Sequence, residues 1–140
     1  MALHGITEAL KGEGTYAAIM GVAAAHPTAR ADEFVIGCPE GARPFLLQGI
    51  SNVTSMGDTV RPPVVLVITA TDREAEDTVL ALSSLIPAEE AVLFPAWETL
   101  PHERLSPRSD TVGQRLSVLR SLAGLGATFP RIVVAPVRSL

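Results

Sequence analysis

The chain contains 140 residues, of which 47% are hydrophobic and 19% charged, and its formal net charge is −4. This length and composition are typical of one globular domain with a sizeable core, and they exclude an intrinsically disordered chain. The negative charge excludes a general electrostatic attraction to nucleic acid, although it is compatible with a local basic patch.

Cysteine content and hydropathy indicate the compartment. The single cysteine, Cys38, cannot form an internal disulfide or a zinc cluster, which favours a reducing environment. No apolar run approaches the roughly 20 residues that a membrane span needs, and the N-terminus lacks the basic and apolar regions of a signal peptide. We therefore expect a cytoplasmic protein that has no metal site and does not contact a membrane.

The first 32 residues are rich in alanine and glycine and contain no pattern that indicates chemistry. Thr15 is placed to cap a helix that continues to Ala25 and ends before Pro27. We expect residues 1–32 to form a helical adapter that packs on a main domain comprising residues 33–140.

The main domain begins with a predicted strand, Glu33–Gly37, and a predicted helix starts at Pro44, a favourable first-turn position. A strand, a glycine-containing turn and a helix occupy the place of a phosphate-binding loop in nucleotide-binding α/β domains. That loop requires closely approaching glycines, a lysine and a Ser or Thr, whereas this turn has one glycine, no lysine and an acidic Glu40. We interpret it as a degenerate loop without a cofactor, and Cys38 as a small core residue, because no base lies near it in the sequence. The loop comprises Cys38, Pro39, Glu40, Gly41, Ala42 and Arg43.

The next segments alternate between strand and helix patterns. The polar stretch Ser51–Pro63 is predicted to be a surface insertion, and the β-branched run Val64–Thr69 a strand covered on both faces. Thr71 and Glu74 form a capping-box pattern at the start of a helix. One face of this helix is apolar at helical spacing, and Pro87 ends it; the face comprises Ala75, Val79, Leu82 and Ile86.

The third strand and helix follow in the same order. Ala91–Phe94 is predicted to be a short buried strand, and Pro95–Asp110 a stiff loop whose three prolines restrict the backbone. The next helix is expected to start within Ser109–Thr111, where Thr111 and Gln114 form a second capping box, and to continue to Ala123. Its apolar face is expected to comprise Val112, Leu116, Leu119 and Leu122.

Arg131–Pro136 is the last predicted strand, and only four residues follow it. The alternation of strands and helices predicts an α/β fold, a three-layer sandwich with a mostly parallel sheet and right-handed crossovers. Because a parallel sheet requires cover on both faces, we expect a further helix after this strand. The chain is therefore expected to be the opening piece of a larger protein.

One block closely resembles a known family. The residues FPAWETLPHERLSP at positions 94–107, followed by Asp110 and GQRL at positions 113–116, are similar to the N-terminal module of the bacterial transcription-repair coupling factors (the Mfd family). The resemblance extends over residues 33–140. It implies a domain similar to the repair protein UvrB, with a RecA-like fold related to the P-loop NTPases, whose nucleotide site has been lost.

The resemblance also implies a role for the parent protein. Members of this family resemble ATP-dependent DNA translocases that displace stalled RNA polymerase and recruit nucleotide-excision repair, with UvrA, RNA polymerase and DNA as partners. ATP and magnesium are expected only in a motor that lies C-terminal to this segment. The segment itself is expected to be non-catalytic.

Within the block, a basic and aromatic set is the candidate interaction surface: Trp97, His102, Arg104, Arg108 and Arg115. Phosphate binding requires several converging arginines with aromatics for stacking, and the intervening acids Glu98, Glu103 and Asp110 weaken that interpretation. The alternatives are a structural brace, a protein-binding surface and direct contact with DNA. His102 beside Glu103 lacks a nucleophile and an orienting group, so it does not predict a catalytic site.

Three functions remain open on the sequence alone. The leading hypothesis is a non-catalytic UvrB-like module of a transcription-repair coupling factor. The alternatives are a nucleotide-binding helicase fragment with an atypical phosphate loop, in which Arg43 would contact the nucleotide, and a simple DNA-binding module.

Overall fold

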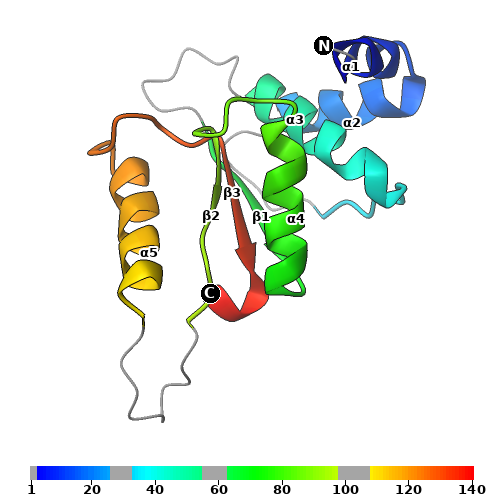
Figure 1. Ribbon diagram of the computed structural model, residues 1–140. Helices are drawn as coiled ribbons and strands as arrows, with labels where there is room; N and C mark the ends of the chain where they lie inside the picture. The colour runs from blue at the N-terminus through cyan, green and yellow to red at the C-terminus, as the bar shows by residue number, and fades with distance from the viewer. Residues whose placement is uncertain (1–2, 26–32, 55–62, 98–107) are drawn as a thin grey trace.

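The computed structural model describes residues 3–25, 33–54, 63–97 and 108–140 (Figure 1). Its centre is a parallel sheet of three strands in the order β1-β3-β2, formed by β1 (Val65–Thr69), β2 (Ala91–Leu93) and β3 (Ile132–Pro136). Val65 and Ala91 both pair with Ile132, so the two outer strands begin level with each other. The predicted α/β fold with a parallel sheet is confirmed.

Helices lie on both sides of this sheet (Figure 1). On one side are α3 (Arg43–Thr54) and α4 (Asp72–Ser83), and on the other side is α5 (Ser109–Leu122). The core fills the space between α4 and the sheet, where apolar side chains of the helix meet those of the central strand. It comprises Ala75, Leu82, Ile86, Ala91, Ile132 and Val134.

The start of α4 follows the predicted capping box. The hydroxyl oxygen of Thr71 accepts the Glu74 backbone N–H at 3.2 Å, which satisfies one of the donors that a helix leaves free at its N-terminus. Ala75 and Leu82 are fully buried one and three turns into the helix, as the apolar spacing predicts. In α4, the cap and the buried face that the sequence predicts are therefore both present in the structure.

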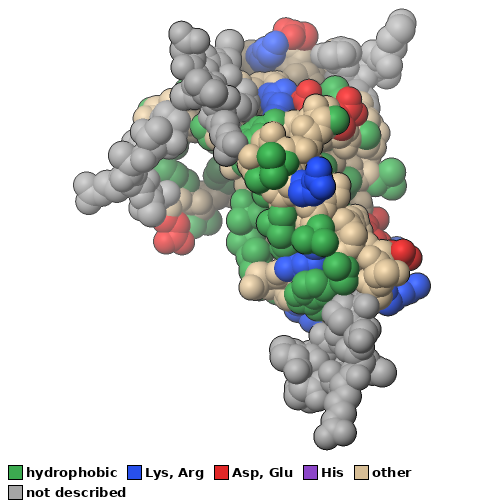
Figure 2. Space-filling view, turned by 90° about the vertical axis from the view of Figure 1, so that its left-hand side faces the viewer, with side chains coloured by type: hydrophobic (Ala, Val, Ile, Leu, Met, Phe, Trp, Pro, Cys, Tyr) green, Lys and Arg blue, Asp and Glu red, His purple; other side chains and the backbone are tan. Residues whose placement is uncertain are grey.

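The other face of the sheet is less covered. Val65 and Val67 pack on the core side, so the alternation of a strand directs Leu66 and Ile68 to the α5 side, where both are more than half exposed. Leu116 and Leu119 of α5 are also exposed. Figure 2 shows hydrophobic side chains gathered in the middle of the molecular face that carries α5.

An arginine joins three elements at the amino end of the sheet. The Arg131 guanidinium, just before β3, donates to the Glu90 carboxylate at 3.0 Å and to the Asn52 side-chain oxygen at 2.6 Å. Glu90 directly precedes β2, and Asn52 lies in α3. This cluster consequently attaches the last turns of α3 to the sheet.

Two further helices, α1 (Leu3–Lys11) and α2 (Gly14–Ala25), precede the sheet, and α2 packs on α3. A Cβ atom at Gly49 would overlap the Tyr16 hydroxyl and the Met20 sulfur, so glycine permits the close approach of α2 and α3. The predicted cap at Thr15 is wrong. The Glu13 carboxylate instead accepts the Tyr16 backbone N–H at 2.9 Å, and this hydrogen bond lowers the pKa of Glu13.

Burial of Tyr16 predicts a loss of stability in alkali. Desolvation raises the pKa of its phenol above the usual value of 10, because burial disfavours the phenolate. The stabilisation is present below the unfolded-state pKa and is lost as the pH rises through the folded-state pKa. The melting temperature should therefore fall more steeply above pH ~10 for the native chain than for Tyr16→Phe, which has no ionisable phenol. Parallel declines in thermal scans at successive pH values would show that Tyr16 ionises freely in the folded state.

The predicted strand Glu33–Gly37 is wrong. These residues are extended, but they form no strand and lead through a short 3₁₀ helix, Glu40–Ala42, into α3. Their apolar, β-branched composition is typical of a strand, yet a strand exists only where a neighbour supplies hydrogen bonds. The Cys38–Arg43 loop consequently does not follow a strand of the sheet, and Cys38 is half-buried.

The prediction of a surface insertion over Ser51–Pro63 fails at its beginning. Residues 51–54 form the last turn of α3, and Ser51 is fully buried, with its hydroxyl donating to the Gln48 carbonyl at 2.9 Å. Residues 55–62 lie outside the described part of the chain.

The predicted capping box of α5 is wrong, and so is its predicted apolar face at Leu116 and Leu119. The helix begins at Ser109, with Arg108 as a cap that makes no side-chain capping bond, and Thr111 is buried inside the first turn. Thr111 and Val118 are its buried residues, whereas Leu116 and Leu119 are exposed. Amphipathic spacing predicts an apolar face but not the partner that covers it.

Candidate functional site

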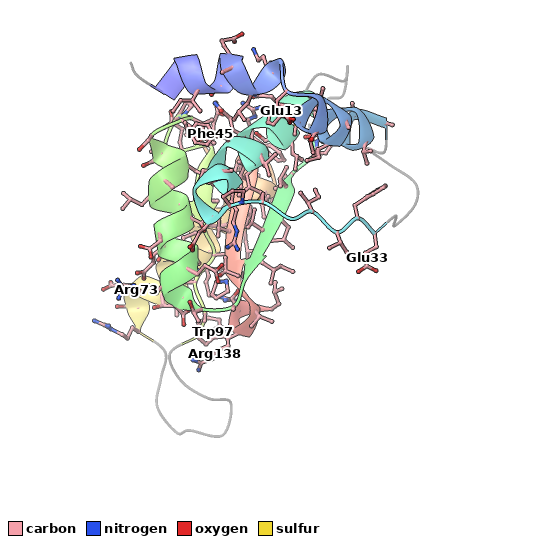
Figure 3. The ribbon with its side chains drawn as sticks, turned by 90° about the vertical axis from the view of Figure 1, so that its right-hand side faces the viewer. Glu13, Glu33, Phe45, Arg73, Trp97 and Arg138 are labelled. Carbon is pink, nitrogen blue, oxygen red and sulfur yellow. The ribbon has the colours of Figure 1, made fainter. Side chains whose placement is uncertain are left out.

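The carboxyl end of β2 carries an aromatic and arginine cluster. The guanidinium carbon of Arg115, in the second turn of α5, lies 3.9 Å from the centre of the Phe94 ring and 4.4 Å from that of Trp97. A guanidinium at such distances is attracted electrostatically by the ring electrons. Figure 3 shows Trp97, Arg138 and Arg73 at the same end of the molecule, the end at which the strands finish.

Two backbone carbonyls accept hydrogen bonds from the same guanidinium. Arg115 donates to the Pro95 oxygen at 2.5 Å and to the Ser139 oxygen at 3.2 Å. Desolvation lowers the pKa of Arg115 below its usual range, but an arginine remains charged at neutral pH. The side chain thus connects α5 to the segments that follow β2 and β3, which favours the brace among the predicted roles.

The structure brings together two of the five predicted surface residues. Trp97 stacks on Arg115, and its side chain is partly exposed. The Arg108 carbonyl accepts the Val112 backbone N–H at 3.1 Å at the start of α5. His102 and Arg104 lie outside the described residues, so the complete surface remains a prediction.

Sequence reasoning missed three members of the cluster. Phe94 supplies a ring, and Pro95 and Ser139 each supply a carbonyl. An aromatic residue that directly follows a short buried strand was an available signal for Phe94. No sequence signal indicates Ser139, because its contribution is a backbone oxygen brought near α5 by the course of the chain.

Between β1 and α4, a strand leads directly into the N-terminus of a helix, which is a position where anions commonly bind. One carboxylate oxygen of Glu74 accepts the Ala70 backbone N–H at 3.2 Å, and the other accepts a hydrogen bond from Arg43 at 3.1 Å. The Thr71 hydroxyl accepts the Glu74 N–H. Two backbone donors of this turn, those of Ala70 and Glu74, are therefore used by this chain's own side chains and not left for an anion.

A groove of about 800 Å³ lies between the start of α3 and α4. Charged residues of both signs line it, and they form ion pairs: Arg43 with Glu74 at 3.1 Å, and Arg73 with Asp77 at 3.8 Å. Compensated charge of this kind gives the groove no strong preference for an anion or a cation.

The described residues contain neither a metal site nor a membrane span. No group of three or more His, Cys, Asp or Glu side chains is arranged to hold a metal ion in the part of the chain that the structure describes. Over those same ranges, no helix has both the length and the apolar character needed to cross a membrane.

Comparison with known proteins places these features in a family. No family model matches the chain. The transcription-repair-coupling factors of Mycobacterium bovis and Mycobacterium tuberculosis are each 41% identical to it over 116 residues, which cover 79% of this chain. The chain spans only 8% of the length of these curated relatives. Over the matched residues, the chain belongs to the family of the transcription-repair coupling factors.

Proposed function

We propose that the chain is the N-terminal, UvrB-like module of a transcription-repair coupling factor, and that it acts by recognition and positioning rather than by catalysis. The parent protein would be an ATP-dependent DNA translocase that displaces stalled RNA polymerase and recruits nucleotide-excision repair. Its partners would be RNA polymerase, UvrA, DNA and the remaining domains of its own chain. ATP and magnesium would bind in the motor of the parent protein, and cytoplasmic localisation remains part of this prediction.

The observation that supports a non-catalytic role is the Glu74 carboxylate that occupies the turn between β1 and α4. In RecA-like and other P-loop domains, a phosphate binds to backbone donors between a strand and a helix N-terminus. Here the Glu74 carboxylate accepts the Ala70 donor and also binds the nearby Arg43. Phosphate would have to displace a carboxylate held by two partners, in a turn without glycine or lysine.

The same contact weakens the alternative of a nucleotide-binding helicase fragment. That alternative assigns Arg43 to the nucleotide, whereas the Arg43 guanidinium is paired with Glu74. A nucleotide would gain the attraction of Arg43 only by breaking this ion pair.

The test is titration of the 140-residue chain with ATP and magnesium in a calorimeter. We expect no saturable heat up to about 1 mM ATP and no rise in melting temperature, because only a ligand that binds the folded state stabilises it, by an amount that grows with the ratio of ligand concentration to dissociation constant. The matched variants are Arg43→Ala and Arg73→Ala, which should both behave as the native chain. An ATP-dependent rise in melting temperature that Arg43→Ala removes, and Arg73→Ala retains, would establish the nucleotide-binding alternative instead.

The domain organisation belongs to the same proposal. Residues 1–32 would form the adapter and residues 33–140 the degenerate RecA-like domain. The packing of α2 on α3 supports an adapter that is fixed to the domain rather than loosely attached. In addition to Gly49, the Thr7 hydroxyl lies 3.4 Å from the Gln48 side-chain oxygen, so both adapter helices approach α3.

A further inference from the structure

Helix α3 is held to α4 and the sheet mainly by polar contacts. All of α3 is described, and its buried residues are small or polar: Gln48, Gly49 and Ser51. The Gln48 side-chain amide donates to the Leu85 carbonyl at 3.2 Å, and the Arg131 guanidinium donates to the Asn52 side-chain oxygen at 2.6 Å. Leu47 is the member of α3 that packs against the core cluster. The contact therefore differs from that of α4, which buries fully apolar side chains on the sheet.

The charged groups of this contact stabilise it weakly. The Arg131 side chain is mostly buried, yet its Nε atom has no hydrogen-bond partner among the described residues. At the other end of α3, the Arg43 side chain that pairs with Glu74 is 53% exposed. Water replaces hydrogen bonds and exposed ion pairs when they open, and an unsatisfied buried donor disfavours the closed state. The polar contacts of α3 can therefore be exchanged for contacts with water at little cost.

The adapter helices, by contrast, pack closely on α3. Gly49 allows the Tyr16 hydroxyl and the Met20 sulfur to lie against the α3 backbone, and Tyr16 is 6% exposed. The Thr7 hydroxyl of α1 lies 3.4 Å from the Gln48 side-chain oxygen. Figure 1 shows the three helices together on one side of the molecule, opposite α5. Helix α3 thus packs more extensively on α2 than on α4 or β1.

We propose that α1, α2 and α3 form one unit that detaches from α4 and the sheet, and rejoins them, while the sheet, α4 and α5 stay folded. Opening breaks the polar contacts of α3 and leaves the apolar cluster between α4 and the sheet closed, apart from the contact of Leu47. A segment held by few apolar contacts opens with a free energy below that of global unfolding. The boundary of the movable unit consequently lies at the end of α3 and not at residue 32, where the proposed adapter ends.

Detachment changes the surface that the domain presents. It separates Arg43 from Glu74 and exposes the sides of α4 and β1 that α3 contacts. Glu74 retains its hydrogen bond from the Ala70 N–H, so the turn between β1 and α4 stays occupied by the carboxylate. The fold can therefore hide or present this side of α4 without unfolding its core, whatever the ATP titration shows.

The experiment is native-state hydrogen exchange of the 140-residue chain, followed by NMR at low urea concentrations. The three helices contain 9, 12 and 12 residues, and helices of this length are marginal in water once they detach. The amides of α2 and α3 should therefore exchange at least ~10-fold faster than those of β3, with a smaller dependence on urea. Equal rates and equal urea dependence in α3 and β3 would contradict the proposal.

Two variants distinguish a separate unit from one cooperative fold. Ile132→Val removes a methyl group from the core, which stays closed in the open state, so it should accelerate exchange in β3 about fivefold and leave α2 and α3 unchanged. Asn52→Ala removes an acceptor of Arg131 and should accelerate exchange in α2 and α3 about tenfold. The matched control is Arg73→Ala, an exposed position on α4 outside this contact, which should change neither.

Two results with these variants would overturn the proposal. If Ile132→Val accelerates exchange in α3 as much as in β3, the whole chain opens as a single cooperative unit. If α2 alone exchanges fast, and α3 exchanges at the rate of β3, the adapter detaches without α3.

Discussion

Replacing Arg115 with alanine is expected to lower the free energy of unfolding by about 2–4 kcal/mol. The substitution removes two hydrogen bonds from a charged donor and its contacts with the Phe94 and Trp97 rings. It also leaves the Pro95 and Ser139 carbonyls without this donor. The effect is large because Arg115 is the side chain through which α5 reaches both following segments.

Urea unfolding followed by tryptophan fluorescence measures this effect directly, because Trp97 is the single tryptophan of the chain. Arg115→Lys should recover no more than about 1 kcal/mol, since an ammonium lacks the planar, forked geometry needed for both carbonyls. The matched control is Arg120→Ala on the exposed side of the same helix, which should change stability by less than about 0.5 kcal/mol. Equal effects of the Arg115 and Arg120 substitutions would show that Arg115 does not brace α5.

Leu82→Ala should destabilise the chain by about 3–4 kcal/mol. Leu82 is fully buried between α4 and the sheet, where it packs in the same cluster as Ile132 and Val134. Its truncation removes apolar contacts and leaves a cavity that the rigid central strand cannot fill by moving. Chemical denaturation with circular dichroism detection measures the change.

Leu80→Ala is the control for this prediction. Leu80 lies two residues earlier on the same helix and is largely exposed. Its truncation should change the stability by less than about 0.5 kcal/mol. A loss at Leu80 similar to that at Leu82 would mean that the core extends over both sides of α4.

The sequence predicted where helices and strands form better than which strands pair and which helix faces are buried. The three strands of the sheet and the start of α4 follow from short apolar runs, β-branched in β1 and β3, and from the Thr71–Glu74 pattern, which are local signals. Glu33–Gly37 has the same local signal but no neighbouring strand, so its composition alone was misleading. The face of α5 was mispredicted for a similar reason, because periodicity cannot show which apolar stripe meets the sheet.

In the candidate site, too, the local pattern was predictable and the contacts between distant residues were not. The sequence placed Trp97 and Arg115 in one block, but their stacking depends on how α5 returns past the end of β2. The degenerate phosphate loop was assigned to Cys38–Arg43 from a strand that does not form. In the turn that leads from β1 into α4, the Glu74 carboxylate accepts the Ala70 backbone N–H. Arg43, from a distant position in the sequence, binds the other oxygen of the same carboxylate.

The strand order also has a consequence for the time at which the fold forms. β1 and β2 are not neighbours, because β3, the last of these three strands to be synthesised, lies between them. A ribosome that has released everything up to α5 has therefore made two strands that cannot pair with each other in the native way. Parallel pairing between segments far apart in sequence is slow and leaves strand edges exposed in the meantime. The nascent chain should consequently depend on early helix packing, such as that of α2 on α3, until the central strand emerges.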